Sequence, residues 1–123
     1  GENFKIGAFN ISVFSVRYDQ NGNEYFKLSP NHHFVIADIT LTNTSDEPAE
    51  FVPLLHLHMR DSLNRVYSVE PIPTEFGQWS GSLLPHDTVR QEIGFMVPNT
   101  ETKLRLYFET GTPNREVGVV NLP

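Results

Sequence analysis

The sequence predicts one all-β domain, an immunoglobulin-like sandwich of two antiparallel sheets with about seven or eight strands. Two observations support this fold class. Short runs rich in β-branched and aromatic residues alternate between apolar and polar side chains, as half-buried strands do. Nine prolines and eight glycines separate these runs, whereas helical periodicity is nearly absent. The 123 residues are expected to form a single domain over residues 1–123, and a small barrel is the alternative architecture.

Composition excludes several classes of protein. The formal net charge is −6, and the scattered Lys and Arg residues leave no basic face for nucleic acid. The chain has no cysteine, which excludes disulfides and thiolate metal sites. No apolar stretch is long enough to span a bilayer, so we expect membrane contact only through an anchor outside this chain. Gly1 is interpreted as a residue left by cloning, ahead of a trimmed mature domain.

The first predicted strand covers residues 8–18. Its apolar positions change parity between Val13 and Phe14, which predicts a β-bulge at that point. Asn21-Gly22 then favours a tight hairpin turn, because both residues tolerate positive φ. A short returning strand is therefore expected over residues 25–28.

The clearest strands are predicted over residues 34–42 and 88–97. Alternate side chains in both are aliphatic or aromatic, so one face of each strand is expected to lie in the core. Phe34 and Ile36 also make the start of the first of these strands apolar on both faces, and Gln91 is the polar exception in the second. The predicted inward residues are Val35, Ala37, Ile39 and Leu41, followed by Val89, Ile93, Phe95 and Val97.

The strand predicted over residues 55–60 places His56, His58 and Arg60 on its outer face and Leu55, Leu57 and Met59 on its inner face. A turn at residues 61–64 leads into another strand at residues 65–69. A long irregular segment follows over residues 70–84. Two further strands are expected at residues 104–108 and 117–120.

Three motifs follow one another along the middle of the chain. Residues 34–45 form a strand of alternating aliphatics that ends in a turn led by Asn43. Residues 57–67 combine alternating apolar residues with Asp61, a turn, a basic residue and Tyr67. Residues 84–98 contain a Leu-Pro turn and a strand that ends in Pro98. From Ile11 to Phe108, this ordered set resembles an uncharacterised immunoglobulin-like domain family found on secreted and lipid-anchored proteins of Gram-positive bacteria, which shares its fold with a secreted mycobacterial antigen.

The resemblance implies a fold and a location. It implies no activity, because the family has no established catalytic residues and a fold alone does not determine function. Two turns depart from the family's pattern, since Asn64 and His86 stand where the family usually has glycine. These departures leave the turn types open.

His56 and His58 are the candidate metal ligands. Their i,i+2 spacing places both imidazoles on one face of a strand, and neutral imidazole binds zinc or copper. His32, His33 or His86 would have to supply a third ligand. The competing and favoured interpretation is a polar outer face that uses histidine by chance.

The loop at residues 19–24 carries oxygen ligands at near-alternate positions, which is typical of calcium loops. These residues are Asp19, Asn21, Asn23 and Glu24. A bidentate Glu at the end of the full pattern is missing, and hairpin turn chemistry explains the loop better.

Phe76 and Trp79, in the segment 70–84, are the candidate ligand contacts. Aromatic side chains on a loop held by a rigid sandwich are suited to contact protein or sugar. The favoured alternative is that both rings fold back and cover the core, because large aromatics are usually mostly buried.

We therefore expect a non-enzymatic, extracellular or surface-anchored bacterial module that binds, adheres or acts as a scaffold, as a monomer or weak dimer. Its partner would be a protein or a cell-wall ligand, and no cofactor is expected. An envelope protein that binds zinc or copper through His56 and His58 is the alternative. A hydrolase ranks last, because the sequence lacks a Gly-x-Ser-x-Gly nucleophile turn.

Overall fold

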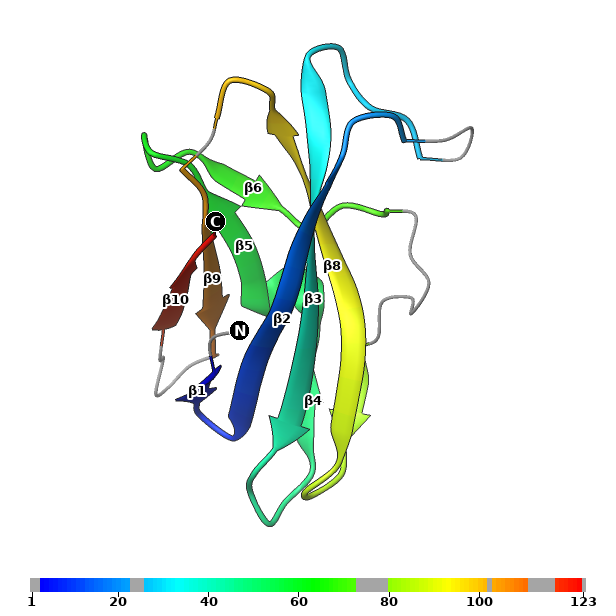
Figure 1. Cartoon of the computed structure of the whole chain (residues 1–123). Coiled ribbons are helices and arrows are strands. Elements are labelled where there is room, and N and C mark those ends of the chain that lie inside the picture. The colour runs from blue at the N-terminus through cyan, green and yellow to red at the C-terminus, as the bar shows by residue number, and fades with distance from the viewer. Residues whose placement is uncertain (1–2, 23–25, 73–79, 102, 111–116, 123) are drawn as a thin grey trace.

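A computed structural model describes residues 3–22, 26–72, 80–101, 103–110 and 117–122. Two four-stranded antiparallel sheets form the two layers of a β-sandwich (Figure 1). The first sheet contains, in order, β1 (Asn3–Ile6), β2 (Phe9–Asp19), β3 (His32–Asn43) and β8 (Thr88–Pro98). The second contains β10 (Val117–Asn121), β9 (Arg105–Glu109), β5 (Leu57–Arg60) and β6 (Val66–Ser68). The predicted sandwich is confirmed.

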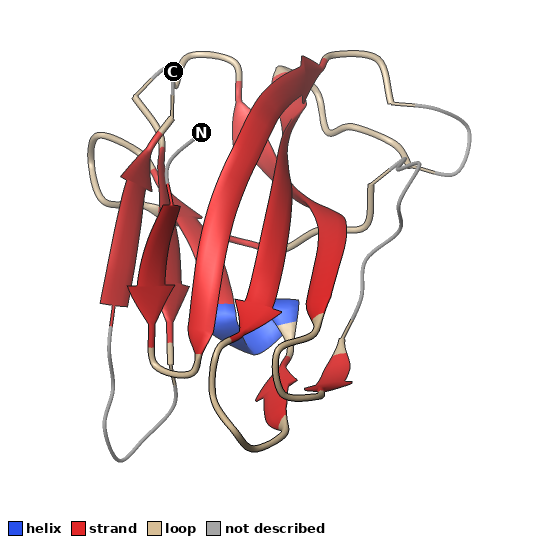
Figure 2. Cartoon of the chain, turned by 60° about the horizontal axis from the view of Figure 1, so that its bottom comes forward, coloured by secondary structure: helices blue, strands red, loops and turns tan. Residues whose placement is uncertain are grey.

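Two short strands and one short helix complete the described elements. β4 (Ala49–Phe51) pairs with β7 (Gly81–Leu83) as a separate two-stranded sheet. The helix α1 (Pro53–His56) lies toward the lower ends of the strands in Figure 2. The described residues thus contain ten strands, more than the sequence predicts, because β4 and β7 are too short to show an alternating pattern.

The core lies between the inner faces of the two sheets. The predicted inward residues of β3 are all buried, and so are Ile93, Phe95 and Val97 of β8, while Val89 is half-buried against them. Gln91 is fully buried on the same face. The second sheet contributes Leu57, Met59, Leu106, Phe108 and Val120.

The predicted β-bulge is present in β2. The register between β2 and β3 shifts between Val13 and Ser15, and Phe14, the extra residue, is 66% exposed. After the bulge Val16 pairs with Ala37 and packs against the core. The change of parity in the sequence therefore located the bulge correctly.

The predicted returning strand at residues 25–28 is wrong for residues 26–28, which form no strand; Tyr25 lies outside the described residues. β2 instead pairs directly with β3, so no edge is left for a strand between them. Phe26 and Leu28 pack over a second apolar cluster, formed by Phe34, Ile36 and Ile72. Their apolar side chains thus cover the outer face of the first sheet.

Gly94 in β8 lets the segment that follows β6 cross this outer face. The amide of Glu70 donates to the carbonyl of Gly94 at 2.8 Å. A Cβ atom at position 94 would lie 2.1 Å from Cγ2 of Ile72, a distance that real side chains do not tolerate. The close approach of the two backbones requires glycine here.

The turn after β3 is organised by the buried side chain of Asn43. Its Nδ2 donates to the carbonyls of Glu47 at 2.7 Å and Leu83 at 2.9 Å. Its Oδ1 accepts hydrogen bonds from the amide and the hydroxyl of Ser45, at 2.9 and 2.8 Å. A motif that the sequence associates with the family is therefore a structural hub, which ties the turn after β3 to β7.

The two departures from the family's glycines fall on left-handed backbone. Asn64 has φ 61° and His86 has φ 66°, a region that glycine adopts without steric cost and that Asn tolerates better than most residues. The turns keep the geometry that glycine would allow, although the side chains differ.

Candidate functional site

The predicted pair of metal ligands does not share a face. His56 ends α1 instead of lying on β5, and its ring stacks on the buried Phe51 and Phe108, with centroids 5.5 and 6.2 Å away. His58 lies on β5 and stacks on Tyr107 at 4.8 Å. Phe108 and Tyr107 are neighbours in β9 and point to opposite faces, so the two imidazoles lie on opposite sides of the second sheet.

The shared strand face predicted for His56 and His58 is therefore wrong. Pro53 begins a helix, as proline at the first helical position often does, and this helix removes His56 from the strand. Nδ1 of His56 lies 3.0 Å from both the amide nitrogen and the carbonyl oxygen of Val52. In the ranges that the structure describes, no three His, Cys, Asp or Glu side chains are grouped to hold a metal ion.

His56 and His58 are not expected to form a joint Zn²⁺ site. Titration of the metal-free domain with Zn²⁺ should therefore show no saturable binding at micromolar concentrations that requires both residues. The reason is that one ring is packed against core aromatics and the other faces outward. Isothermal calorimetry of the wild type and of the double variant His56→Ala, His58→Ala measures this. Tight binding that the double variant loses would contradict the separation of the two rings.

In the loop that resembles a calcium-binding loop, Asp19 has a structural role. Oδ1 of Asp19 accepts hydrogen bonds from the amides of Asn21 at 2.9 Å and Gly22 at 3.0 Å. This is the arrangement by which Asp side chains stabilise turns. Asn23 and Glu24, like the predicted contact residues Phe76 and Trp79, lie outside the described residues.

Asp61 is a fully buried carboxylate that accepts four hydrogen bonds. Its Oδ1 accepts from the amides of Leu63 at 2.9 Å and Arg65 at 3.0 Å. Its Oδ2 accepts from Nε of Arg65 and from the hydroxyl of Tyr67, both at 2.7 Å. The Asp-turn-basic-x-Tyr motif of the sequence is therefore one closed network, which shapes the β5–β6 hairpin.

This network shifts the pKa values of its members in opposite directions. Burial alone would raise the pKa of Asp61, but the hydrogen bonds from Tyr67, Arg65 and Leu63 outweigh it and hold that pKa well below its usual range. Burial and the hydrogen bond to Asp61 raise the pKa of Tyr67 to about 12. Both groups keep their ordinary charge state at neutral pH, so neither is prepared to transfer a proton there.

Two ion pairs on the outer face of the first sheet are likewise structural. Arg17 of β2 binds Glu92 through two contacts of 3.0 and 3.3 Å. Arg90 binds Asp38 through two contacts of 3.0 and 2.6 Å. Each guanidinium is matched by one carboxylate in fork-to-fork geometry, which neutralises both charges.

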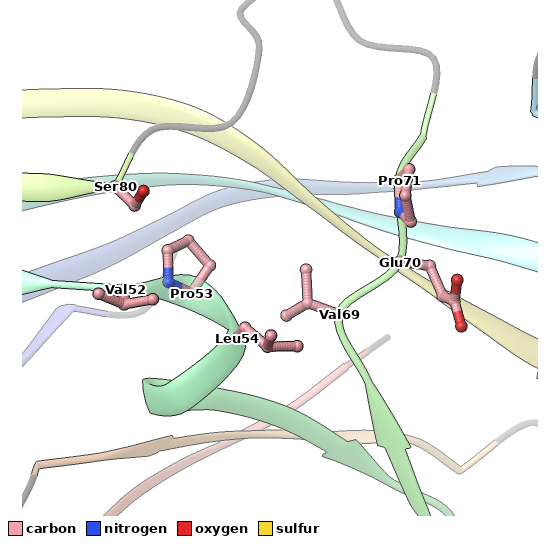
Figure 3. Close-up of a pocket in the computed structure, with 7 residues that line it drawn as sticks. All are labelled: Val52, Pro53, Leu54, Val69, Glu70, Pro71 and Ser80. Carbon is pink, nitrogen blue, oxygen red and sulfur yellow. The ribbon is translucent and has the colours of Figure 1, made fainter.

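An apolar hollow of about 420 Å³ adjoins α1. Figure 3 shows Pro53 and Leu54 of α1 on one side and Val69 on the other, with Ser80 and Pro71 toward opposite ends. The carboxylate of Glu70 is directed away from these residues (Figure 3). The hollow therefore lies between the two described ends of the segment 70–84, where the sequence predicts a contact surface.

Two adjacent leucines of α1 are exposed; Leu54 lines this hollow, and Leu55 is its neighbour in the helix. Leu54 is 65% exposed and Leu55 is 72% exposed, although both are large and apolar. The sequence interpretation missed them, because it assigned Leu55 to the inner face of a strand. Two signals were available: Pro53 can begin a helix, and two adjacent leucines cannot both face the core from one strand. Exposed apolar side chains grouped beside an apolar hollow are typical of a contact surface.

Comparison with known proteins supports the fold and leaves the activity open. The profile of a family described as "Domain of unknown function (DUF4352)" matches residues 1–116. Among solved structures, the yjhA protein of Bacillus subtilis is similar with a TM-score of 0.82 and 19% identity, over 100% of this chain and 97% of that one. An uncharacterised β-sandwich protein of Clostridium difficile has a TM-score of 0.58 and 15% identity, over 95% and 88% of the two chains. No functionally curated protein matches the sequence significantly.

One similar structure carries a name that bears on location. The B. subtilis protein ycdA, named a "putative lipoprotein", is similar with a TM-score of 0.77 and 11% identity. The similarity covers 97% of this chain but only 38% of ycdA, so this chain corresponds to one part of that protein. Within the part of the chain that is described, no helix is both long and apolar enough to cross a membrane.

Proposed function

Because this chain belongs to the DUF4352 family of domains of unknown function, we propose that it is a non-catalytic binding module of the bacterial cell envelope, which holds an apolar segment of a partner protein in the hollow beside α1. The observation that carries this proposal is the exposure of Leu54, which lines the hollow together with Val52, Pro53 and Val69, and of Leu55, its neighbour in α1. Burying one leucine side chain contributes about 1.5–3 kcal/mol, so a partner that covers both gains a large part of its affinity there.

The rest of the described molecule supports a role in binding over one in catalysis. The buried carboxylate of Asp61 is held ionised by its hydrogen bonds, and those of Asp38 and Glu92 are matched by arginines. Among the described residues that line the hollow, the polar side chains are those of Glu70 and Ser80. Acyl or phosphoryl transfer needs a nucleophile activated by a base, whereas apolar side chains make up most of the described lining.

The extracytoplasmic location is part of the same proposal. It is supported by the similarity to ycdA, a "putative lipoprotein" of a Gram-positive bacterium. In the proposed arrangement the domain contacts the membrane only through an anchor outside this chain, and presents the hollow to other envelope proteins. The contact role that the sequence predicts for Phe76 and Trp79 stays a prediction, because both lie outside the described residues.

The experiment that tests the proposal is photo-crosslinking in the native host. A benzophenone amino acid replaces Leu55 in one variant and Phe14 in another. Phe14 is the matched control, because it is 66% exposed and lies on the other sheet. We expect one defined protein adduct at position 55 and none at position 14.

The affinity of the crosslinked protein for the purified domain then decides whether the leucines carry the binding. Leu54→Ser, Leu55→Ser is expected to weaken binding by about 10–100-fold, whereas Phe14→Ser leaves it unchanged. Both variants should keep the stability of the wild type within about 0.5 kcal/mol, because the substituted side chains are exposed. Equal adducts at the two positions, or an affinity that the double variant retains, would overturn the proposal.

A further inference from the structure

A second surface of the molecule combines an aromatic ring with two arginines that no described carboxylate neutralises. It lies on the outer face of the second sheet, where Tyr107 of β9 is flanked by arginines of β5 and β9. Cζ of Arg60 lies 4.4 Å from the centroid of the Tyr107 ring, and Cζ of Arg105 lies 5.7 Å from it. His58 stacks on the same ring at 4.8 Å. Two guanidinium groups this close to one ring can contact a single anionic group together.

Among the residues that the structure describes, neutral acceptors and no carboxylate orient these two guanidinium groups. Nε of Arg60 donates to Nε2 of His58 at 3.0 Å. Nη2 of Arg105 donates to the carbonyl of Asp61 at 2.9 Å and to Oδ1 of Asn64 at 2.7 Å. Among the described arginines the other three, Arg17, Arg65 and Arg90, each bind at least one carboxylate. Within the described ranges, Arg60 and Arg105 are therefore held in place without a carboxylate partner.

This arrangement is unfavourable for the isolated domain. Arg60 and Arg105 are direct partners across β5 and β9, and like charges at directly opposite positions destabilise a sheet. The chain carries a net charge of −6, so acidic residues are plentiful elsewhere.

The surroundings extend the positive surface on one side and an apolar surface on the other. A hollow of about 450 Å³ beside Arg105 is lined also by Lys103 and by uncharged residues: Ser62, Asn64, Leu104, Asn121 and Leu122. On the neighbouring strand β10, Val119 is the direct partner of Tyr107. Val117 and Val119 are both 46% exposed.

We propose that this face, formed by Arg60, Arg105 and Tyr107 with Lys103 and Val119 beside them, binds an acidic segment of a partner protein. Charge complementarity requires an anionic occupant. Tyr and Arg are the residue types that dominate protein interfaces, and the exposed valines of β10 suit aliphatic side chains interspersed with carboxylates. A phosphate polymer would leave those valines uncovered. The face shares no lining residue with the hollow beside α1, so the two proposals stand independently.

The test uses the ¹⁵N-labelled domain and three probes: the blocked peptide acetyl-(Glu-Val)₃-amide, its Gln-for-Glu analogue, and inorganic polyphosphate. We expect the Glu peptide to shift the amide resonances of Arg60, Arg105 and Tyr107 saturably, and the Gln peptide to leave them in place. Arg60→Gln, Arg105→Gln should weaken Glu-peptide binding at least tenfold. Arg17→Gln removes one charge from the other sheet and should leave binding unchanged.

Several results would overturn the inference. Equal shifts with the Gln peptide would show that carboxylates are not recognised. Shifts with polyphosphate but not with the Glu peptide would assign the face to phosphate polymers. Retained binding in the double arginine variant would place the site elsewhere. Arg60→Gln alone, which leaves the hydrogen bonds of Arg105 intact, keeps the test valid if the double variant fails to fold.

Discussion

Phe51→Ala is expected to lower the free energy of unfolding by about 3–5 kcal/mol, the largest loss that we expect from one substitution in this domain. Phe51 is fully buried. Its ring stacks on Phe108 with centroids 5.6 Å apart and meets Phe9 edge-on at 5.9 Å. Phe9 belongs to the first sheet and Phe108 to the second, so Phe51 fills the space between the layers. Since natural domains are stable by only about 5–15 kcal/mol, much of the stability depends on this ring.

Urea denaturation followed by circular dichroism measures this loss. Phe14→Ala provides the control, because that ring lies at the bulge and is 66% exposed; its expected loss is below about 0.5 kcal/mol. Similar losses for the two variants would show that β4 does not fill the core as described.

Asp61→Asn is expected to destabilise the β5–β6 hairpin more than Tyr67→Phe does. Removal of the Tyr67 hydroxyl takes away one hydrogen bond to a charged group, which costs about 1.5 kcal/mol. The asparagine changes every contact of the network at once, since Arg65 loses the carboxylate that its Nε contacts at 2.7 Å. The midpoints of urea denaturation of the two variants, measured side by side, test this order. A larger loss for Tyr67→Phe would contradict the hub role of Asp61.

The same network predicts how stability depends on pH. The pKa of Asp61 is lower in the folded domain than its unfolded value of about 4. Its contribution is therefore fully present above that value and is lost as pH falls toward the folded pKa. The pKa of Tyr67 is raised to about 12, so its contribution is complete below about pH 10 and is lost as pH rises toward 12.

In Asp61→Asn the free energy of unfolding is expected to fall less steeply both toward acid pH and toward alkaline pH. The variant has no carboxylate at position 61 that acid could protonate. The Tyr67 phenol also loses the charged acceptor that helps to raise its pKa. Denaturation midpoints across pH, together with ultraviolet titration of the tyrosines, measure the acid and the alkaline dependence of stability. Asp46→Asn serves as the control because the Asp46 side chain is 98% exposed. If stability depends on pH in Asp61→Asn as it does in the wild type, the pH dependence belongs to other groups.

The strands that the sequence predicts best are those with long period-two patterns. Residues 34–42 and 88–97 fall within β3 and β8. Alternation of side chains over so many residues is typical of a strand with one buried face. The bulge at Phe14 was also predictable, since an extra residue reverses the parity of every side chain after it. In contrast, Phe26 and Leu28 have strand-like composition but no partner strand, and pairing partners are not encoded locally.

The candidate sites were less predictable for the same physical reason. Leu55 and His56 looked like members of the strand because they continue its alternation, and the helix signal from Pro53 was weaker than that pattern. The surface around Tyr107 depends on the register that sets Arg60 opposite Arg105. A shift of one residue would send these side chains to the other face. That register follows from the packing of the whole second sheet.

The hydrogen-bonded motifs and the exposed surfaces play different roles in this account. Asn43 and Asp61, which carry the resemblance to the family, are buried and hold turns. The features proposed to bind partners are the exposed leucines of α1 and the half-buried side chains of Arg105 and Tyr107 on β9. Substitution at the first group is therefore expected to change stability, and substitution at the second to change binding with little effect on stability.

Hydrogen–deuterium exchange of the free domain and of its complex with the protein crosslinked at position 55 tests the central claim most directly. The account predicts slower exchange in the complex at the amides of Leu54, Val69 and Glu70, which line the hollow, and at the amide of Leu55, the neighbour of Leu54 in α1. It predicts unchanged exchange in the hairpin at residues 61–68. Protection confined to other surfaces, with the amides at the hollow unaffected, would contradict the claim that this domain binds its partner beside α1.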